Sequence, residues 1–256
     1  MLEALQLTKF YGSVPAVQNI SFQIGPGSVL GYLGPNGSGK STTVKMLIGL
    51  LQPTNGEVHF DGRNIQQDLV AYRKHLGYVP EEPNLYSHLT GWEYLEMVGA
   101  LRGMSEARLS AKAAQLLELL SLSAYKHVQM SSYSKGMRQR ILLIAALMDN
   151  PEVLILDEPL SGLDVTSAMI VKNLIQVLSH KGRFIFYCSH VLEVVEKVCT
   201  QLIVIRKGRM ITRGSTEEVL RQIGQSTLEQ AFVQLVEDKD AGQLASDMVD
   251  VMMAPR

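Results

Sequence analysis

The sequence predicts an α/β fold with a mainly parallel central β-sheet, an antiparallel β-subdomain at the N-terminus and an inserted α-helical subdomain. Short, continuously apolar runs at Val29–Leu33, Val153–Leu156 and Phe184–Cys188 alternate with segments of helical periodicity. A run without polar alternation indicates a parallel strand that is covered on both faces. Alternation of such strands with helices is typical of an open α/β sheet, which places functional groups at the carboxyl ends of its strands.

The composition indicates a globular chain with one large core or two closely joined subdomains. The chain has 256 residues, of which 46% are apolar and 19% are charged, and this is enough to bury a sizeable core. Its 24 basic and 25 acidic side chains give a net charge of −1, and they form no basic block. We therefore expect no nucleic acid as a partner.

No segment is predicted to cross a membrane or to direct secretion. The longest uninterrupted apolar run, residues 141–148, is far shorter than the roughly 20 residues that a spanning helix needs. The N-terminus lacks a basic region followed by an apolar stretch, so we expect no secretory signal. Cys188 and Cys199 are expected to be core thiols in a reducing compartment.

The N-terminal segment predicts strands of a sheet that covers the start of the domain. Residues 2–7 alternate between apolar and polar side chains, and residues 17–24 continue this pattern after a turn at Tyr11 and Gly12. Phe10 or Tyr11 is suited to stack on an adenine base, which needs no purine-specific hydrogen bond. An aromatic plug of the core remains the alternative for both rings.

A phosphate-binding loop follows the first apolar run. The motif G-x-x-x-x-G-K-[ST] is formed by Gly34, Pro35, Asn36, Gly37, Ser38, Gly39, Lys40 and Ser41. Its glycines let backbone N–H groups face a triphosphate, and a helix that begins near Lys40 adds the positive end of its dipole. The motif predicts that Lys40 contacts the β- and γ-phosphates and that Ser41 ligates Mg²⁺. A flexible surface turn is the alternative, but it leaves the preceding strand and the following helix unexplained.

The stretch between this loop and residue 90 predicts one helix and two short strands. Residues 42–51 carry apolar side chains at helical spacing, whereas residues 57–60 and 76–79 have the composition of strands. Pro80 ends the second of these strands. Glu81 then stands at a strand end, where an open α/β sheet places functional groups.

The segment after residue 90 is predicted to be almost wholly helical and to form the inserted subdomain. Helices are expected over residues 92–101, 106–120 and 134–148. Ser105 is the expected N-cap of the second helix. Ser134 and Gly136, at the start of the third, leave backbone N–H groups free to receive an anion. An ordinary capped helix accounts for these two residues equally well.

Two strand ends carry charged or titratable side chains. Asp157 and Glu158 directly follow Val153–Leu156, and a carboxylate at the end of a buried strand is costly without a cation. Beside a phosphate loop that cation is Mg²⁺, so Asp157 is expected to hold the metal and Glu158 to face the γ-phosphate. His190 follows Phe184–Cys188 and Ser189, from where its imidazole reaches the γ-phosphate or the attacking water. A structural role is the alternative for His190.

The remaining chain predicts further helices, a hairpin and a tail. Helices are expected over 165–178, after the turn 161–164, and over 191–199, 216–223 and 228–235, with hairpin strands over 202–206 and 209–212. Residues 237–256 are charged and without pattern up to a weakly amphipathic end at 244–253. This tail either is loosely ordered or contacts a partner.

With these motifs in this order, residues 2–236 resemble the nucleotide-binding subunit of an ATP-binding cassette transporter. The resemblance implies a P-loop NTPase with a RecA-like core over residues 1–236, with a helical subdomain at about 84–150. The implied nucleotide-binding residues are Tyr11, Gly34, Pro35, Asn36, Gly37, Ser38, Gly39, Lys40, Ser41, Thr42, Glu81, Ser134, Gly136 and Asp164. The implied catalytic residues are Lys40, Glu158 as general base and the switch histidine His190, and the implied metal ligands are Ser41, Glu81 and Asp157.

Two positions depart from the usual pattern of this family. Tyr133–Met137 takes the place of the signature, usually Leu-Ser-Gly-Gly-Gln, but Lys135 and Met137 replace a glycine and the glutamine. This variant resembles the subgroup that serves exporters of drugs, ions, lipids and polysaccharides. Glu81 stands where the family usually has the glutamine of its Q-loop, so its side chain accepts hydrogen bonds and ligates cations but donates no amide hydrogen bond.

The resemblance also implies partners and a location. ATP with Mg²⁺ would lie between the phosphate loop of one copy and the Ser134 segment of a second cassette subunit, either identical or different. A separate integral-membrane permease would dock near Glu81–Leu101. The subunit would then be cytoplasmic and peripheral on the inner face of the cell membrane, and it would couple ATP hydrolysis to transport, with export favoured.

Two other classes of protein compete with this interpretation. A soluble cassette ATPase that acts on nucleic acid or protein complexes often has two cassettes or a long coiled-coil insertion, whereas this sequence shows one set of motifs and an insertion of ordinary length. A P-loop kinase or nucleotide-dependent switch has no use for the signature helix or for His190.

Overall fold

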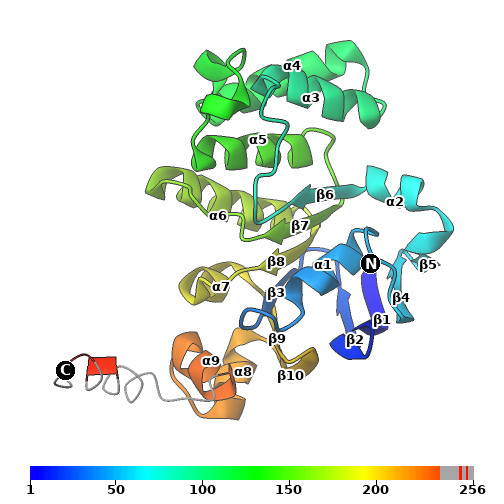
Figure 1. Ribbon diagram of the computed structural model, residues 1–256, viewed down its shortest axis with the longest axis vertical. Helices are drawn as coiled ribbons and strands as arrows, with labels where there is room; N and C mark the ends of the chain where they lie inside the picture. Colours follow the sequence, from blue (N-terminus) through cyan, green and yellow to red (C-terminus); the bar gives the residue numbers. More distant parts are fainter. Residues whose placement is uncertain (237–247, 250–251, 253–256) are drawn as a thin grey trace.

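The computed structural model describes residues 1–236, 248–249 and 252, which form two β-sheets with helices packed around them (Figure 1). Apart from residues 248, 249 and 252, the predicted tail at 237–256 lies outside the described residues. The strands are β1 (Leu2–Tyr11), β2 (Val14–Ile24), β3 (Val29–Leu33), β4 (Asn55–Phe60), β5 (Arg63–Asn64), β6 (Leu76–Val79), β7 (Val153–Asp157), β8 (Phe184–Cys188), β9 (Gln201–Arg206) and β10 (Arg209–Gly214).

Helices connect or cover most of these strands. The α-helices are α1 (Lys40–Leu47), α2 (Leu69–Lys74), α3 (Gly91–Leu101), α4 (Glu106–Leu119), α5 (Lys135–Leu147), α6 (Val165–His180), α7 (Leu192–Val198), α8 (Thr216–Ile223) and α9 (Leu228–Val236). Short 3₁₀ segments are η1 (Ile65–Gln67), η2 (Ser123–Tyr125) and η3 (Met130–Ser132). Within residues 1–236 and the few further described positions, no helix has the length and apolar character required to cross a bilayer.

The larger sheet is mainly parallel, as predicted. Its strand order is β10-β9-β3-β8-β7-β6, and only the pairing of edge strand β10 with β9 is antiparallel. The register pairs Tyr32 of β3 with Cys188 of β8, and Cys188 in turn with Asp157 of β7. The carboxyl ends of these strands therefore lie level with one another, so the loops that follow them emerge along one edge of the sheet.

The larger sheet is covered on both faces, which explains the continuous apolar runs in its sequence. Successive residues of one strand enter different hydrophobic clusters, because side chains alternate between the faces of a sheet. Leu154 and Leu156 of β7 pack into the cluster beneath α3–α7, whereas Val153 and Ile155 pack into the cluster shared with β1, β2 and α1. The prediction of a buried parallel strand at this position is confirmed.

The smaller sheet is antiparallel, with the strand order β2-β1-β4-β5. Strand β1 pairs with both β2 and β4, and its side chains Leu2, Ala4 and Leu7 are buried in the second cluster. Helix α1 lies between the two sheets and buries Val44 and Leu47. The N-terminal antiparallel sheet predicted from the alternating pattern is confirmed, and it packs beside the loop that precedes α1 (Figure 1).

Helices α3, α4 and α5 lie between β6 and β7 in the sequence and form the upper part of the molecule in Figure 1. Helix α3 begins with a capping box in which Thr90 and Glu93 exchange hydrogen bonds between side chain and backbone. The Tyr133 hydroxyl donates a hydrogen bond of 2.6 Å to the Tyr125 carbonyl and fixes the segment that leads into α5.

Several expectations from the sequence differ from the structure. Strand β5 and helix α2 were not predicted, because they span only two and six residues and are too short to show a period. Helix α1 ends at Leu47 rather than at residue 51, because Gly49 adopts a φ of +68° and turns the chain out of the helix. Ser105 stands at the N-cap of α4 as predicted, but its hydroxyl makes no capping hydrogen bond.

We expect Gly77→Ala to destabilise the fold, because a Cβ at this position of β6 would lie 2.7 Å from the Ala146 carbonyl oxygen of α5. Overpacking of this kind costs about 1–3 kcal/mol. The matched control is Gly25→Ala, whose Cβ meets only the Ser28 hydroxyl at 3.7 Å and whose effect should stay within about 0.5 kcal/mol. Urea unfolding measures both variants, and equal midpoints would show that β6 and α5 are less closely packed than described.

Candidate functional site

The loops that leave β3, β6, β7 and β8 enclose a pocket of about 200 Å³. Its lining residues are Ala16, Asn36, Gly37, Gly39, Lys40, Ser41, Thr42, Glu81, Asp157, Glu158 and His190. A larger hollow of about 410 Å³ lies between β4, β5 and α2, but none of the predicted site residues lines it. The structure therefore brings the phosphate loop, three carboxylates and one imidazole together, as the positions of the strand ends predict.

The phosphate loop holds its shape through close backbone contacts. Gly39 has a φ of +107°, and a Cβ on it would lie 2.4 Å from the Ala16 carbonyl oxygen of β2, so only glycine fits at this position. The Ser38 N–H donates to the Pro35 carbonyl at 3.1 Å, and the Ser38 carbonyl accepts from the Gly208 N–H at 3.0 Å. The smaller sheet and the β9–β10 hairpin thus support the loop from two sides.

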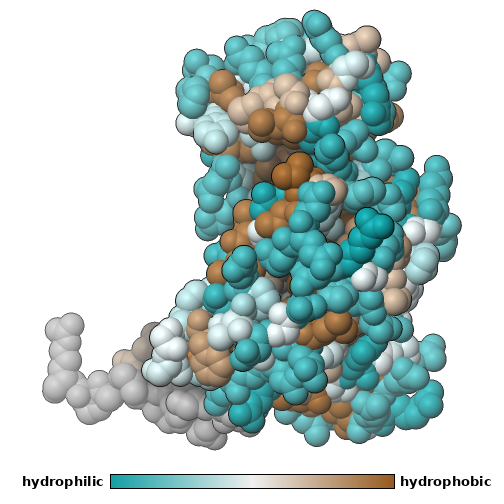
Figure 2. Space-filling view, turned by 90° about the vertical axis from the view of Figure 1, so that its right-hand side faces the viewer, coloured by the Kyte–Doolittle hydropathy of each residue, from teal (hydrophilic) through white to brown (hydrophobic). Residues whose placement is uncertain are grey.

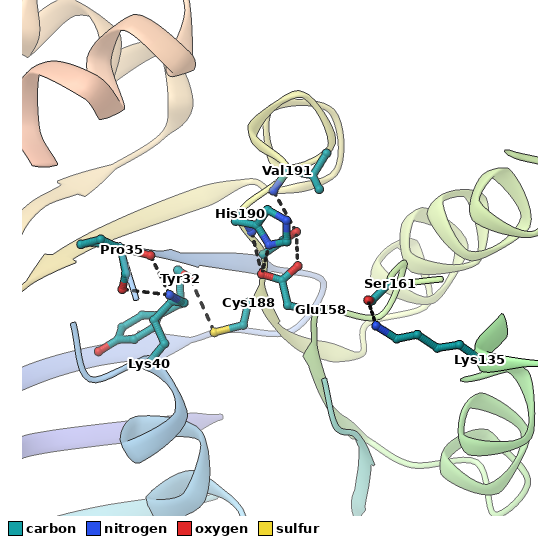
Figure 3. Close-up of polar contacts among 11 residues, drawn as sticks. Tyr32, Pro35, Lys40, Lys135, Glu158, Ser161, Cys188, His190 and Val191 are labelled. Atoms are coloured by element: carbon teal, nitrogen blue, oxygen red, sulfur yellow. Dashed lines mark hydrogen bonds and ion pairs between the residues drawn. The ribbon is translucent and has the colours of Figure 1, made fainter. Parts of the chain in front are cut away.

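Lys40 folds back over this loop (Figure 3). Its ammonium donates hydrogen bonds of 2.6 Å to the Gly34 carbonyl and 3.1 Å to the Pro35 carbonyl. These acceptors are neutral, whereas a phosphate oxygen is charged and forms a stronger bond with an ammonium. The lysine therefore already lies in the pocket with its charge directed at the loop, and an anion is the better partner for it.

The carboxylates of the pocket repel one another. The Asp157 side chain is only 6% exposed, and burial, followed by the charges of Glu81 and Glu158, raises its pKa to about 6, against which Lys40 acts in the opposite direction. Within the described residues, no three His, Cys, Asp or Glu side chains are close enough to hold a metal by themselves. The negative charge of the site thus favours a bound cation. The protein side chains alone, however, do not supply a complete set of ligands for it.

Glu158 has an unusual backbone and a fully engaged carboxylate. Its φ is +46°, a left-handed conformation that is uncommon for a residue with a side chain. Oε1 accepts hydrogen bonds from the His190 backbone N–H at 2.8 Å and from His190 Nδ1 at 2.7 Å, and Oε2 accepts from the Ser189 hydroxyl at 3.0 Å. Figure 3 shows the imidazole and the carboxylate facing each other at the ends of β7 and β8.

Seven of the predicted site residues do not line this pocket, namely Gly34, Pro35 and Ser38 of the phosphate loop, and Tyr11, Ser134, Gly136 and Asp164. Tyr11 is 52% exposed as a whole residue, and the Lys9 ammonium lies 5.9 Å from the centroid of its ring. Asp164 caps α6 by accepting hydrogen bonds from the Ser167 N–H and hydroxyl, and these hydrogen bonds lower the pKa of its carboxyl group.

The predicted anion-binding helix start lies apart from the pocket. The Ser134 hydroxyl accepts a hydrogen bond of 3.2 Å from the Met137 N–H, so the capped-helix alternative describes part of this segment. Lys135 donates a hydrogen bond of 2.7 Å to Ser161, and Figure 3 places this pair on the far side of Glu158 from Lys40. This segment therefore does not contribute to the pocket of its own chain.

Two residues of the site were not assigned from the sequence. Ala16 lines the pocket because β2 packs against Gly39, a contact that no local pattern reveals. Ser189 holds Glu158, and its only signal was a polar side chain directly after an apolar strand. The positions of Lys40, Ser41, Asp157 and Glu158 in the pocket, in contrast, follow directly from their motifs.

The chain is similar to known ATP-binding proteins. Residues 17–161 match the family described as ABC transporter. The linearmycin resistance ATP-binding protein LnrL of Bacillus subtilis is 35% identical over 91% of this chain and 75% of its own length.

Solved structures give the same result. One described as the ATP-binding subunit of an ABC transporter is 30% identical over 92% of this chain and 99% of its own, with a TM-score of 0.86. A dimeric ATP-binding cassette, MJ0796, in a post-hydrolysis state bound to ADP and Pi is 25% identical over 84% of this chain and 98% of its own, with a TM-score of 0.77.

We expect Asp157→Asn to stabilise the protein at neutral pH in the presence of EDTA. The Asp157 pKa of about 6 lies above the ordinary 3.8, so the wild-type protein loses stability as the pH rises from about 4 to 6. At 1.36 kcal/mol per pKa unit, this difference corresponds to at most about 3 kcal/mol at pH 7. The Asn variant lacks this loss, so the melting temperatures should differ at pH 7 and converge near pH 4. An equal gap at both pH values would contradict the prediction.

Proposed function

The chain belongs to the ATP-binding cassette transporter family, and we propose that the pocket at the end of β3, β6, β7 and β8 is its site of ATP hydrolysis. As a member of this family it is the ATP-binding, ATP-hydrolysing subunit of a transporter. The observation that carries the proposal is the convergence of the phosphate loop, Asp157, Glu158 and His190 on one pocket.

We assign phosphate binding to the loop and to the start of α1. The proposed residues are Gly34, Pro35, Asn36, Gly37, Ser38, Gly39, Lys40, Ser41 and Thr42. Lys40 exchanges its two carbonyl acceptors for oxygens of the β- and γ-phosphates. The exposed N-terminus of α1 adds backbone N–H groups, because Gly39 at its N-cap has no side chain to occupy them.

Mg²⁺ is the proposed metal, and the chemistry of the pocket fits it. The Ser41 hydroxyl and the carboxylates of Asp157 and Glu81 are oxygen donors, which Mg²⁺ prefers, and this ion usually completes its coordination with substrate phosphates and waters. An incomplete protein ligand set and a buried carboxylate with a raised pKa are both consistent with such an ion. When bound, the ion neutralises charge on the β- and γ-phosphates.

Glu158 is the proposed general base and His190 its neighbour at the γ-phosphate. In this proposal a water attacks the γ-phosphorus in line with the leaving ADP, and its proton passes to the Glu158 carboxylate. We propose that the His190 imidazole exchanges Glu158 for a phosphate oxygen, since its side chain is 75% exposed and has room to turn. Lys40 and the dipole of α1 stabilise the charge that develops on the phosphate oxygens.

A second cassette subunit, identical or different, would complete the site. A pocket of about 200 Å³ is smaller than the usual range of roughly 300–1,000 Å³ for ligand sites, so one chain encloses only part of a nucleotide. Ser134 and Gly136 stand at a helix start away from their own pocket, which suits contact with the nucleotide of a partner. We assign Tyr11 to the adenine base and Asp164 to nucleotide binding.

We further propose a permease docking surface at Glu81–Leu101, on a helical subdomain at about residues 84–150 of the 1–236 cassette. Tyr86 and Leu101 are exposed there, and apolar side chains gather in Figure 2 where the upper helical part meets the rest of the molecule. Docking would hold the subunit on the inner face of the membrane. The Lys135 and Met137 signature variant favours an exporter.

We expect Glu158→Gln to lower ATP turnover at least a hundredfold, because an amide cannot accept the proton of the attacking water. ATP binding should persist, and ATP-dependent dimerisation should increase, which size-exclusion chromatography with ATP would show. The control is Glu196→Gln, which replaces an exposed carboxylate of α7 and should leave turnover unchanged. Normal turnover by Glu158→Gln would refute the general-base assignment.

We expect Glu81→Gln to keep ATP turnover within about tenfold of the wild type, which corresponds to about 1.4 kcal/mol in the barrier. The amide oxygen of the new glutamine still accepts hydrogen bonds and can ligate a cation. The substitution also removes one negative charge that faces Asp157. Steady-state phosphate release measures the effect, with Glu82→Gln as the control at an exposed neighbour outside the pocket. A loss of several orders of magnitude would instead make the Glu81 carboxylate essential.

A further inference from the structure

Ser189 is a buried serine whose hydroxyl lies within hydrogen-bonding distance of the Glu158 carboxylate. The residue directly follows β8 and is 2% exposed. Its oxygen accepts a hydrogen bond of 3.1 Å from the Val191 N–H and lies 3.0 Å from Oε2 of Glu158. The Tyr187 hydroxyl also interacts with this side chain, but a carboxylate oxygen is the stronger acceptor. Because a serine hydroxyl has one hydrogen to donate and the Val191 N–H engages a lone pair, we assign that hydrogen to the Glu158 carboxylate.

The three donors to Glu158 differ in how easily they move. The His190 backbone N–H and the Ser189 hydroxyl belong to the two residues that directly follow β8, and they contact different carboxylate oxygens. The His190 imidazole is the third donor and its side chain is largely exposed. If the imidazole turns towards a phosphate, the other two donors remain, with one on each oxygen of the carboxylate.

Glu158 needs such donors because its own surroundings do not favour this conformation. A left-handed backbone conformation is uncommon for a residue with a side chain, and Glu158 has a φ of +46°. The charge of Asp157 lies next to it in the sequence and in the pocket. Without a donor on Oε2, the carboxylate retains only contacts on Oε1 and is able to rotate about its last side-chain bond.

We propose that Ser189 is a positioning residue for Glu158. Its hydroxyl fixes Oε2, so the carboxylate keeps its orientation towards the attacking water after the imidazole leaves Oε1. Ser189 does not line the nucleotide pocket and therefore acts through Glu158. This inference rests on the proposed function, in which Glu158 is the general base.

The kinetic test is Ser189→Ala in the full-length chain with MgATP. We expect kcat to fall about tenfold or more while the KM for ATP stays within about twofold, because the hydroxyl contacts the base and not the nucleotide. The matched control is Ser179→Ala, since this buried serine of α6 donates to the Gly27 carbonyl at 2.6 Å, before β3 begins. The Ser179→Ala variant also loses a buried hydroxyl, but this serine does not contact the site. Its kcat should therefore stay normal.

A double-mutant cycle supplies a readout that is independent of activity. Thermal unfolding is measured without nucleotide for Ser189→Ala, Glu158→Ala and the double variant. We expect Ser189→Ala to lower the melting temperature less in the Glu158→Ala background than in the wild type, because the acceptor is already absent. Ser179→Ala should have the same effect in both backgrounds.

The positioning role of Ser189 and the general-base role of Glu158 are contradicted by different results. A normal kcat for Ser189→Ala, or additive melting shifts in the cycle, would overturn the positioning role of Ser189 and leave the general-base assignment intact. Normal turnover by Glu158→Gln would overturn the general-base assignment, and with it the catalytic role of Ser189, even if the melting shifts remain coupled.

Discussion

The register of the parallel strands is the constraint on which the site depends. Tyr32, Cys188 and Asp157 pair in one row across β3, β8 and β7, so the following residues leave the sheet at the same level. The hydrophobic clusters on both faces hold that register, since a slip by one residue would exchange the side chains of the two faces. The phosphate loop, Glu158 and His190 are therefore brought together by apolar packing far from any of their own interactions.

Local motifs supply the functional residues and tertiary packing brings them together. This difference explains which features could be predicted from the sequence. Apolar runs and the phosphate-loop motif are local patterns, and they identified β3, β7, β8 and the residues at their ends. Ala16 could not be found in this way, because its place in the pocket arises from the packing of one sheet against another. The hydrogen bonds of Lys40 to two carbonyls and of Ser189 to Glu158 likewise depend on tertiary geometry.

The N-caps of two helices also show that a local sequence pattern does not determine tertiary geometry. Ser105 and Ser134 have the same residue type and the same position before a helix, yet only Ser134 accepts a capping hydrogen bond. The preference of serine for this position is an average over many helices, and the loop conformation decides each case. At Ser134 the side chain engages one of the N–H groups of the helix start, so fewer of them are left for an anion than the sequence alone indicates.

The charges of the site fall into two groups that lie apart within one chain. Asp157, Glu81 and Glu158 face one another with Lys40 as the opposing charge in the pocket. Lys135, the first residue of α5 at its positive helix end, lies on the far side of Glu158 from Lys40. In the proposed function, a nucleotide with its metal would supply a cation to the first group and an anion to the second. Because the two groups of one chain lie apart, we infer that a single nucleotide reaches both kinds of group by joining two chains, which would give nucleotide binding a direct mechanical consequence.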